Sequence, residues 1–487
     1  MFAIVNGIIM VPLYLKYMPL STYGAWLASG NVIGLIGVVE SGFSTVITQK
    51  MAVAYALNEK EQFGRLATAN FVVAFLMAFI IFLGGLAFCN FIPNWINAEG
   101  RIHQELKWAI LISSLATAST ILFSLVGVIP QVIQKTFFVG VINTLSIILG
   151  LSVTFFSIIN DVGIVSIALG YFTRSFTNFI ATSIHVKGLW VQYDLPPLRY
   201  SAQVVKELIN ACILPFVAKL SSTIVNNSQN FIIANTISPA SAAIYEITSK
   251  IVTVIRMFVN MMNGSVMSSF ALIFANEDIN YQKESYKKLS VVFFTLLFSG
   301  MLFSYLFTQP IIHFWVGDDK FGGYLLLGLI ILASLTTEIK SFFNNLLMSM
   351  GLIKHTAKLD IYNSGIFIVS LVVFNQFFPL LSIPLSILSS SFLFMLLFGQ
   401  MIAKRFGGTN ISIYKSSIET LTLSCLFTFI SFLLPHQKIT HIYWFLLKVI
   451  FVVSLYFIIL IRINFGLRSI LKTYFYFPLK RKYQFKK

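Results

Sequence analysis

Charged residues are scarce in this sequence, and acidic residues are half as common as basic ones. Only 10% of the 487 residues are charged, with 17 acidic against 34 basic, whereas 57% are hydrophobic. The mean hydropathy is +0.84, an apolar excess that no water-soluble core absorbs. The composition therefore excludes a soluble protein and predicts an all-α polytopic membrane protein.

The sequence also lacks the features that mark an enzyme or a metalloprotein. Its three cysteines lie far apart in apolar segments, and its six histidines are scattered over loops and helix ends, which leaves no disulfide framework and no metal-ligand spacing. No glycine-rich nucleotide loop is present. The longest polar connection, about 187–208, is too short for a soluble catalytic domain. We therefore expect no cofactor, no direct use of ATP and no enzymatic activity.

Long apolar windows, in contrast, recur along the whole chain, and about 20 such residues between polar loops are typical of a transmembrane helix. The first window has no basic lead-in and no cleavage site, which indicates a helix rather than a signal peptide. Its reach of about 21 Å is short of a bilayer, so its true start is left open. The fourteen windows are 2–15, 25–48, 67–92, 108–129, 139–160, 164–185, 209–233, 242–272, 290–307, 324–350, 361–378, 383–402, 418–434 and 443–461.

Lysine and arginine predict how these helices are oriented. With a cytoplasmic N-terminus, 23 of the 34 basic residues fall in cytoplasmic loops and in the tail from Arg462, and 5 fall on the opposite side. This distribution follows the positive-inside rule and predicts that both termini are cytoplasmic. The basic excess thus indicates topology rather than a nucleic-acid partner.

The chain is predicted to form two six-helix lobes with pseudo-twofold symmetry. The Pro196–Pro197 pair marks a break between two helical sets. In addition, "KEQFGRL" at 60–66 resembles "KESYKKL" at 283–289, with six helices between them, as in parallel repeats. The predicted regions are an N-lobe (1–186), a cytoplasmic linker (187–208), a C-lobe (209–402), and two further helices with a basic cytoplasmic tail (403–487).

Eight charged residues lie near the middle of predicted spans, where each costs about 2.5–3.5 kcal/mol on insertion scales. Five are basic and three are acidic: Arg174, Lys219, Lys250, Arg256 and Lys340, then Glu40, Glu246 and Glu338. At about 100° per residue, Glu246, Lys250, Arg256 and Asn260 share one face of the window 242–272. Lys219 and Asn226 share a face of the window 209–233. Lys340 points away from the polar face that carries Glu338.

Two interpretations of these charges are open. The charged groups hold helices together through hydrogen bonds and ion pairs, as Glu246 and Lys250 would, one turn apart. Alternatively, they line a water-filled cavity, which is favoured for Arg174, Lys219 and Arg256 because no acid lies in the same turn. Since the basic groups outnumber the acids, such a cavity attracts an anionic lipid head group rather than a cationic drug.

These patterns give two sets of candidate site residues. The candidates for substrate binding are Arg174, Lys219, Lys250, Arg256, Asn226 and Asn260. The candidates for ion coupling or gating are Glu40, Glu246 and Glu338, with H⁺ or Na⁺ as the coupling ion. Glu40 lies at the margin of a small-residue face in the window 25–48, and its alternative role is to pair with an intramembrane cation such as Arg174.

The first 70 residues carry a family resemblance. "PLYLKYMPLSTYGAWL" (Pro12–Leu27), "ESGFSTVITQKMA" (Glu40–Ala52) and "LNEKEQFGRL" (Leu57–Leu66) resemble the bacterial oligosaccharide flippases of the polysaccharide transporter family. Multidrug and toxin extrusion transporters and lipid II flippases belong to the same superfamily. Helix number and the two-lobe layout extend the likeness over nearly the whole chain. This chain departs from the pattern in two ways. It lacks the short polar lead-in that family members usually have before the first helix. It also lacks the arginine-rich first helix of lipid II flippases, and this second difference argues against lipid II as substrate.

The resemblance implies alternating access to a cationic central cavity. The cargo would be an undecaprenyl-pyrophosphate-linked oligosaccharide, carried across the bacterial inner membrane for O-antigen or capsule synthesis. Membrane lipids, a polysaccharide polymerase and a chain-length regulator are the expected partners. Two alternatives stay open: a multidrug cation antiporter of the same fold, which needs an acidic pocket, and a membrane-embedded polysaccharide polymerase, which usually needs a large outer loop.

Overall fold

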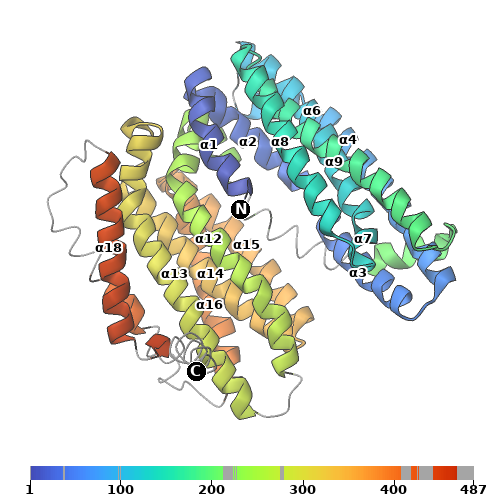
Figure 1. The fold of residues 1–487 in the computed structure, drawn as a ribbon. Helices are drawn as coiled ribbons and strands as arrows, with labels where there is room; N and C mark the ends of the chain where they lie inside the picture. The colour runs from blue at the N-terminus through green and yellow to red at the C-terminus, as the bar shows by residue number, and fades with distance from the viewer. Residues whose placement is uncertain are drawn as a thin grey trace, which may run out of the picture. The chain divides into compact units, whose positions relative to one another are not determined.

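The computed structural model is built from helices (Figure 1). It describes residues 2–36, 39–96, 98, 100–211, 223, 225, 228–274, 279–406, 418–424, 426, 442–464 and 466–468, and none of these residues forms a β-strand. Seven helices within this part are long and apolar enough to cross a membrane, judged by length and composition. The predicted all-α polytopic membrane fold is therefore confirmed.

The chain divides into two compact units, Met1–Ile244 and Tyr245–Lys487. Helix α12 (Pro239–Phe274) begins in the first unit and continues into the second. The predicted lobe boundary lies earlier, at 187–208, and it stays a prediction. The other elements of the first unit are α1 (Phe2–Tyr17), α2 (Leu20–Ile36), α3 (Val39–Ala56), α4 (Lys60–Phe88), α5 (Phe91–Trp95), α6 (Gly100–Val126), α7 (Val128–Val132), α8 (Phe137–Ile159), α9 (Val165–Gln192) and α11 (Gln229–Thr236).

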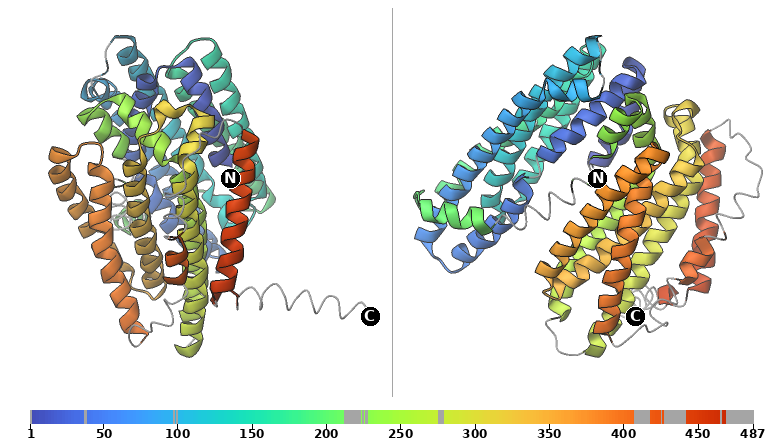
Figure 2. Two further views of the ribbon diagram at one scale, coloured as in Figure 1. Left: turned by 90° about the vertical axis from the view of Figure 1, so that its left-hand side faces the viewer. Right: turned by 180° about the vertical axis from the view of Figure 1, so that it is seen from behind.

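The first unit is organised around α6. This helix packs along α9 and α4, and α8 packs along α9; Figure 2 shows the same bundle from two further sides. Two glycines let α8 and α9 approach closely. A Cβ built on Gly170 would stand 2.6 Å from the Gly150 carbonyl oxygen and would overlap the Thr154 side chain. A small residue at each position is what this crossing requires.

The second unit contains the rest of α12 and a layer of long helices, in which α16 packs against α14 and α15, and α13 packs against α14. A buried tyrosine attaches the last described helix, α18. The Tyr456 hydroxyl accepts a hydrogen bond from Ser299 of α13 at 3.1 Å and lies 2.8 Å from the Ser424 hydroxyl. The elements are α13 (Ile279–Trp315), η1 (Asp318–Lys320), α14 (Tyr324–Ser349), α15 (Ile353–Phe377), α16 (Ser382–Arg405) and α18 (Ile442–Ile463).

Several helices differ in extent from the apolar windows. Helix α4 begins at Lys60 and α13 at Ile279, so the similar segments 60–66 and 283–289 form first turns of helices instead of preceding them. The window 25–48 is covered by α2 and α3. Amphipathic turns continue a helix beyond the bilayer because their backbone hydrogen bonds do not depend on apolar side chains.

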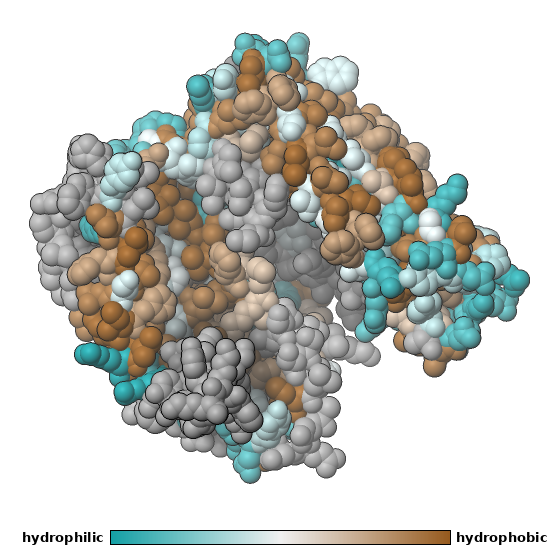
Figure 3. Space-filling model, in the orientation of Figure 1, coloured by the Kyte–Doolittle hydropathy of each residue, from teal (hydrophilic) through white to brown (hydrophobic). Residues whose placement is uncertain are grey.

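The surface has the distribution expected of membrane helices. In Figure 3, hydrophobic side chains cover the sides of helices and hydrophilic side chains gather at helix ends. On α4, Phe75 and Phe79 are 62% and 59% exposed, and on α8, Phe156 is 64% exposed. Large apolar side chains at such exposure are unfavourable in water and are suited to contact with lipid.

The predicted linker is folded onto the first unit. After α9 the chain turns back along the start of α4, where Gly64 lies so close to Pro197 that a Cβ would overlap the Pro197 carbonyl oxygen. An Arg199 Nη1 atom lies 3.0 Å from Glu61 Oε1, and Leu195 is buried in the core. The linker thus has fixed contacts of its own on the first unit.

Candidate functional site

Most of the predicted site residues of the second unit lie on α12. Glu246, Lys250, Arg256 and Asn260 all lie on this single helix, as the periodicity predicts. Lys250 Nζ donates to Glu246 Oε1 at 3.1 Å, and both side chains are about a quarter exposed, at 22% and 24%. The ion pair one turn apart, which the sequence offers as one interpretation, is therefore present.

Arg256 has an acidic partner from another helix. Its Nε donates to Oε1 of Glu338 on α14 at 2.8 Å, and Asn260 Nδ2 lies 3.5 Å from the same oxygen. The Glu338 side chain is only 1% exposed, whereas that of Arg256 is 26% exposed. Arg256 thus binds a buried acid, while part of its own side chain remains accessible.

Two sets of atoms at this ion pair are unpaired within the described residues. Glu338 Oε2 is buried and has no hydrogen-bond partner there. The terminal Nη nitrogens of Arg256 make no hydrogen bond to the described chain, since its one such bond uses Nε. A guanidinium presents its donors as a planar fork that fits carboxylate or phosphate oxygens. Arg256 therefore keeps donors available for an anion.

A second, separate ion pair uses the other side of α14. Lys340 Nζ lies 3.1 Å from Asp360 Oδ1 on α15, and Asn344 Nδ2 donates to Asp360 Oδ2 at 2.8 Å. The prediction that Lys340 points away from Glu338 is confirmed. Asp360 was missed, because it stands one residue before the apolar window 361–378. With Asp360 included, the second unit's Lys250, Arg256 and Lys340 each have an acidic partner.

In the first unit, Arg174 lies on α9 where this helix crosses α8. The Arg174 side chain is partly buried, and no carboxylate of the described chain lies within ion-pair distance of it. One turn further along α9, the buried Asn178 donates to Asn143 Oδ1 of α8 at 2.9 Å. Arg174 thus stands at a polar part of the helix contact, with its guanidinium unpaired among the described residues.

Three predicted site residues cannot be placed. Lys219 and Asn226 lie outside the residues that the structure describes, and the side chain of Glu40, on α3, does so as well. Their predicted roles stay predictions. Among the described residues there is also no group of three or more His, Cys, Asp or Glu side chains that could hold a metal ion.

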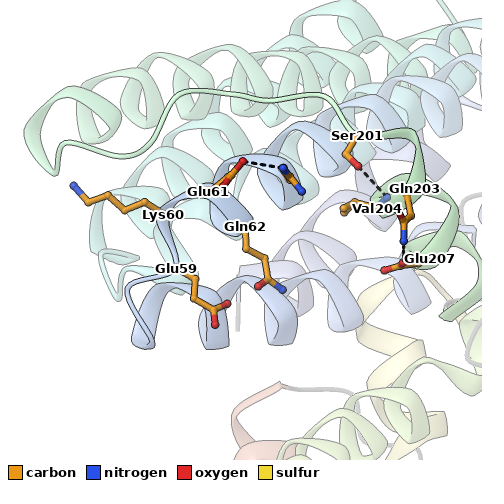
Figure 4. Close-up of a pocket in the computed structure, with 9 residues that line it drawn as sticks. Glu59, Lys60, Glu61, Gln62, Ser201, Gln203, Val204 and Glu207 are labelled. Carbon is orange, nitrogen blue, oxygen red and sulfur yellow. Dashed lines mark hydrogen bonds and ion pairs between the residues drawn. The ribbon is translucent and has the colours of Figure 1, made fainter.

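A hollow of about 510 Å³ lies on the polar end of the first unit, between the start of α4 and residues 201–207 (Figure 4). Glu61 pairs with Arg65 at 2.8 Å, and Gln203 donates to Glu207 at 3.0 Å. Most of its lining residues are polar and exposed. Exposed ion pairs of this kind contribute little free energy, and they do not by themselves indicate a binding site. We therefore assign no ligand to the hollow.

The sequence matches no protein-family model and no curated protein. Solved structures do match. The lipid II flippase MurJ in an inward closed conformation superposes with a TM-score of 0.73 at 15% identity, covering 95% of this chain and 97% of MurJ. An inward-facing multidrug resistance MATE transporter of the MOP superfamily gives 0.62 at 13% identity, covering 84% of this chain and 99% of that one.

A third match is a MOP superfamily transporter from Pyrococcus furiosus, described as having a binding pocket of reverse polarity. Its TM-score is 0.55 at 13% identity, and the match covers 83% of this chain and 95% of that one. At such low identity these likenesses concern the fold. The chain therefore has the helical fold of MOP superfamily transporters over nearly its whole length.

Proposed function

We propose that this protein is a flippase that carries an undecaprenyl-pyrophosphate-linked oligosaccharide across the bacterial inner membrane. The observation that carries the proposal is the match to a lipid II flippase over 95% of the chain with a TM-score of 0.73. The open guanidinium groups of Arg174 and Arg256 support it, because arginine inside a membrane domain is costly unless it serves a polar ligand or pathway. The glycan would then enter O-antigen or capsule synthesis.

Each predicted site residue has a role in this proposal. Arg174 in the first unit and Arg256 in the second are each candidates for contact with the pyrophosphate through the guanidinium group, and Lys219 and Lys250 are candidates for adding positive charge. Asn226 and Asn260 offer amide groups to the sugar hydroxyls. Glu40, Glu246 and Glu338 are the candidates for coupling transport to H⁺ or Na⁺. The prenyl tail stays in the lipid.

The proposal also covers topology and partners. Both termini are cytoplasmic, in accord with the positive-inside count. A polysaccharide polymerase and a chain-length regulator would use the delivered repeat unit on the outer side. The protein itself acts as a transporter and not as an enzyme, and its coupling ion requires no bound cofactor.

The rival function with structural support is multidrug cation transport, because MATE transporters share the fold. A cationic drug needs an acid that is free to pair with it. In the second unit, Glu246, Glu338 and Asp360 each accept from a basic side chain. This pairing disfavours the cation antiporter. A polymerase is disfavoured because the matched structures named above are a transporter and a flippase.

The test uses Arg174→Ala at matched membrane expression in a strain lacking the chromosomal gene. Loss of a charge-assisted contact of about 1.5–3 kcal/mol should lower surface polysaccharide by about tenfold or more. Lys448→Ala is the matched control, since Lys448 is an exposed basic residue on α18 and should have no effect. Undiminished polysaccharide with Arg174→Ala, or drug sensitivity of the deletion strain with normal polysaccharide, would refute the proposal.

A further inference from the structure

The Arg256–Glu338 pair has an unusual division of burial. Glu338 is 1% exposed and held inside the second unit, while Arg256 is 26% exposed and bonds it through Nε alone at 2.8 Å. Nε is the guanidinium nitrogen nearest the side-chain stem, so this bond orients the plane of the group. The terminal nitrogens are left without a partner in the described chain and free to meet a ligand.

We propose that Glu338 is a built-in counter-ion that limits how tightly Arg256 holds the anionic head group of the transported lipid. This inference rests on the proposed flippase function and assigns Glu338 a specific task within it. A transporter must release its cargo as well as bind it. Without the charge of Glu338, Arg256 would bind a pyrophosphate more tightly and release it more slowly.

The geometry supports an electrostatic role for Glu338 rather than displacement by the ligand. Its Oε1 faces both Arg256 and the Asn260 amide, which lies 3.5 Å away, so the carboxylate is fixed between two residues of α12. Its Oε2 is buried, and no donor of the described chain binds it. The negative charge of the Glu338 carboxylate therefore acts on the surroundings of Arg256 and opposes the binding of an anionic head group.

A comparison pair lies two residues away on α14. Lys340 and Asp360 are bonded at 3.1 Å with exposures of 13% and 22%, so this pair is also an interhelical ion pair, but its acid is more exposed than its base. Two residues correspond to about 200° around a helix, which places it on the opposite side of α14. Removing the charge of Asp360, which lies on α15, therefore removes the acid of another interhelical ion pair without changing the surroundings of Arg256.

The experiment measures binding of undecaprenyl diphosphate to the purified full-length protein in detergent, with undecaprenol as the uncharged probe. Glu338→Gln keeps an oxygen that accepts from Arg256 Nε but removes the negative charge. We expect Glu338→Gln to tighten diphosphate binding about tenfold, to slow its dissociation, and to leave undecaprenol binding unchanged. In proteoliposomes, flipping of the diphosphate should slow accordingly.

Two controls separate this effect from a change in folding. Asp360→Asn should bind the diphosphate as the wild type does, and the double variant Arg256→Gln with Glu338→Gln should lose the gain in affinity. Equal or weaker binding by a folded Glu338→Gln variant would overturn the inference while leaving the flippase proposal intact. If the wild-type protein instead binds diphosphate no better than undecaprenol, the flippase proposal itself fails.

Discussion

Arg256 of the second unit and Arg174 of the first unit differ in how they are paired. In the second unit, Arg256 is paired at 2.8 Å with an acid from a neighbouring helix. In the first unit, Arg174 stands at a close helix crossing with no acid of the described chain beside it. The difference teaches that one arginine can share its guanidinium between an ion pair and a ligand, while another, unpaired in the described chain, keeps all of its donors available. Three predictions test this contrast.

The largest effect should come from disrupting the helix crossing that holds Arg174. In Gly170→Ala, the new Cβ would stand 2.6 Å from the Gly150 carbonyl oxygen and would overlap Thr154, so α8 and α9 must separate. We expect a loss of about 2–4 kcal/mol of stability, measured as a lower melting temperature in detergent. Gly188→Ala on the same helix is the control, because nothing lies within 4 Å of its Cβ. Equal melting temperatures for both variants would contradict the packing described.

A smaller but clear loss should follow from Arg256→Ala. This substitution leaves the Glu338 carboxylate, 1% exposed, without its charged donor. Removing one partner of a buried pair is costly, although the exposure of Arg256 reduces the effect, and we expect a loss of about 2 kcal/mol. Chemical or thermal unfolding in detergent checks the value. Adding Glu338→Leu should recover much of it, and failure of that rescue would show that the pair is not the cause.

The smallest effect should come from Arg174→Ala. No carboxylate of the described chain loses a partner in this variant, so its stability should stay within about 0.5 kcal/mol of the wild type. The same variant should nevertheless lose transport, as proposed above. A destabilisation as large as that of Arg256→Ala would show that Arg174 has a structural partner, and the contrast between the two units would then be wrong.

Part of the site followed directly from residue spacing. The 3.6-residue period predicted that Lys250, Arg256 and Asn260 share a face of one helix, and that Lys340 points away from Glu338. The structure has the three residues on one helix, with Arg256 and Asn260 both reaching Glu338, and it pairs Lys340 with Asp360 instead. Glu246 and Lys250 are four residues apart, which is enough to predict their pairing. Local geometry of this kind depends only on the helix itself.

The partner of Arg256 could not be predicted in the same way. Glu338 is 82 residues further along the chain, and no periodicity relates positions on two helices that pack through the fold. Asp360 was missed for a different reason: helix α15 begins at Ile353, ahead of its apolar window, so a residue that precedes the window is part of the helix. An apolar window marks the lipid-exposed length and not the ends of the hydrogen-bonded helix.

The sequence by itself determined that this is a helical membrane protein, how its charges are distributed along the chain, and which charges share a helix face. Those properties follow from hydrophobic transfer and the helical repeat, both of which act locally. Only the tertiary structure decided which basic groups are neutralised and which keep open donors. The reason is that an ion pair between helices depends on their packing, and packing is set by the shapes of many side chains together.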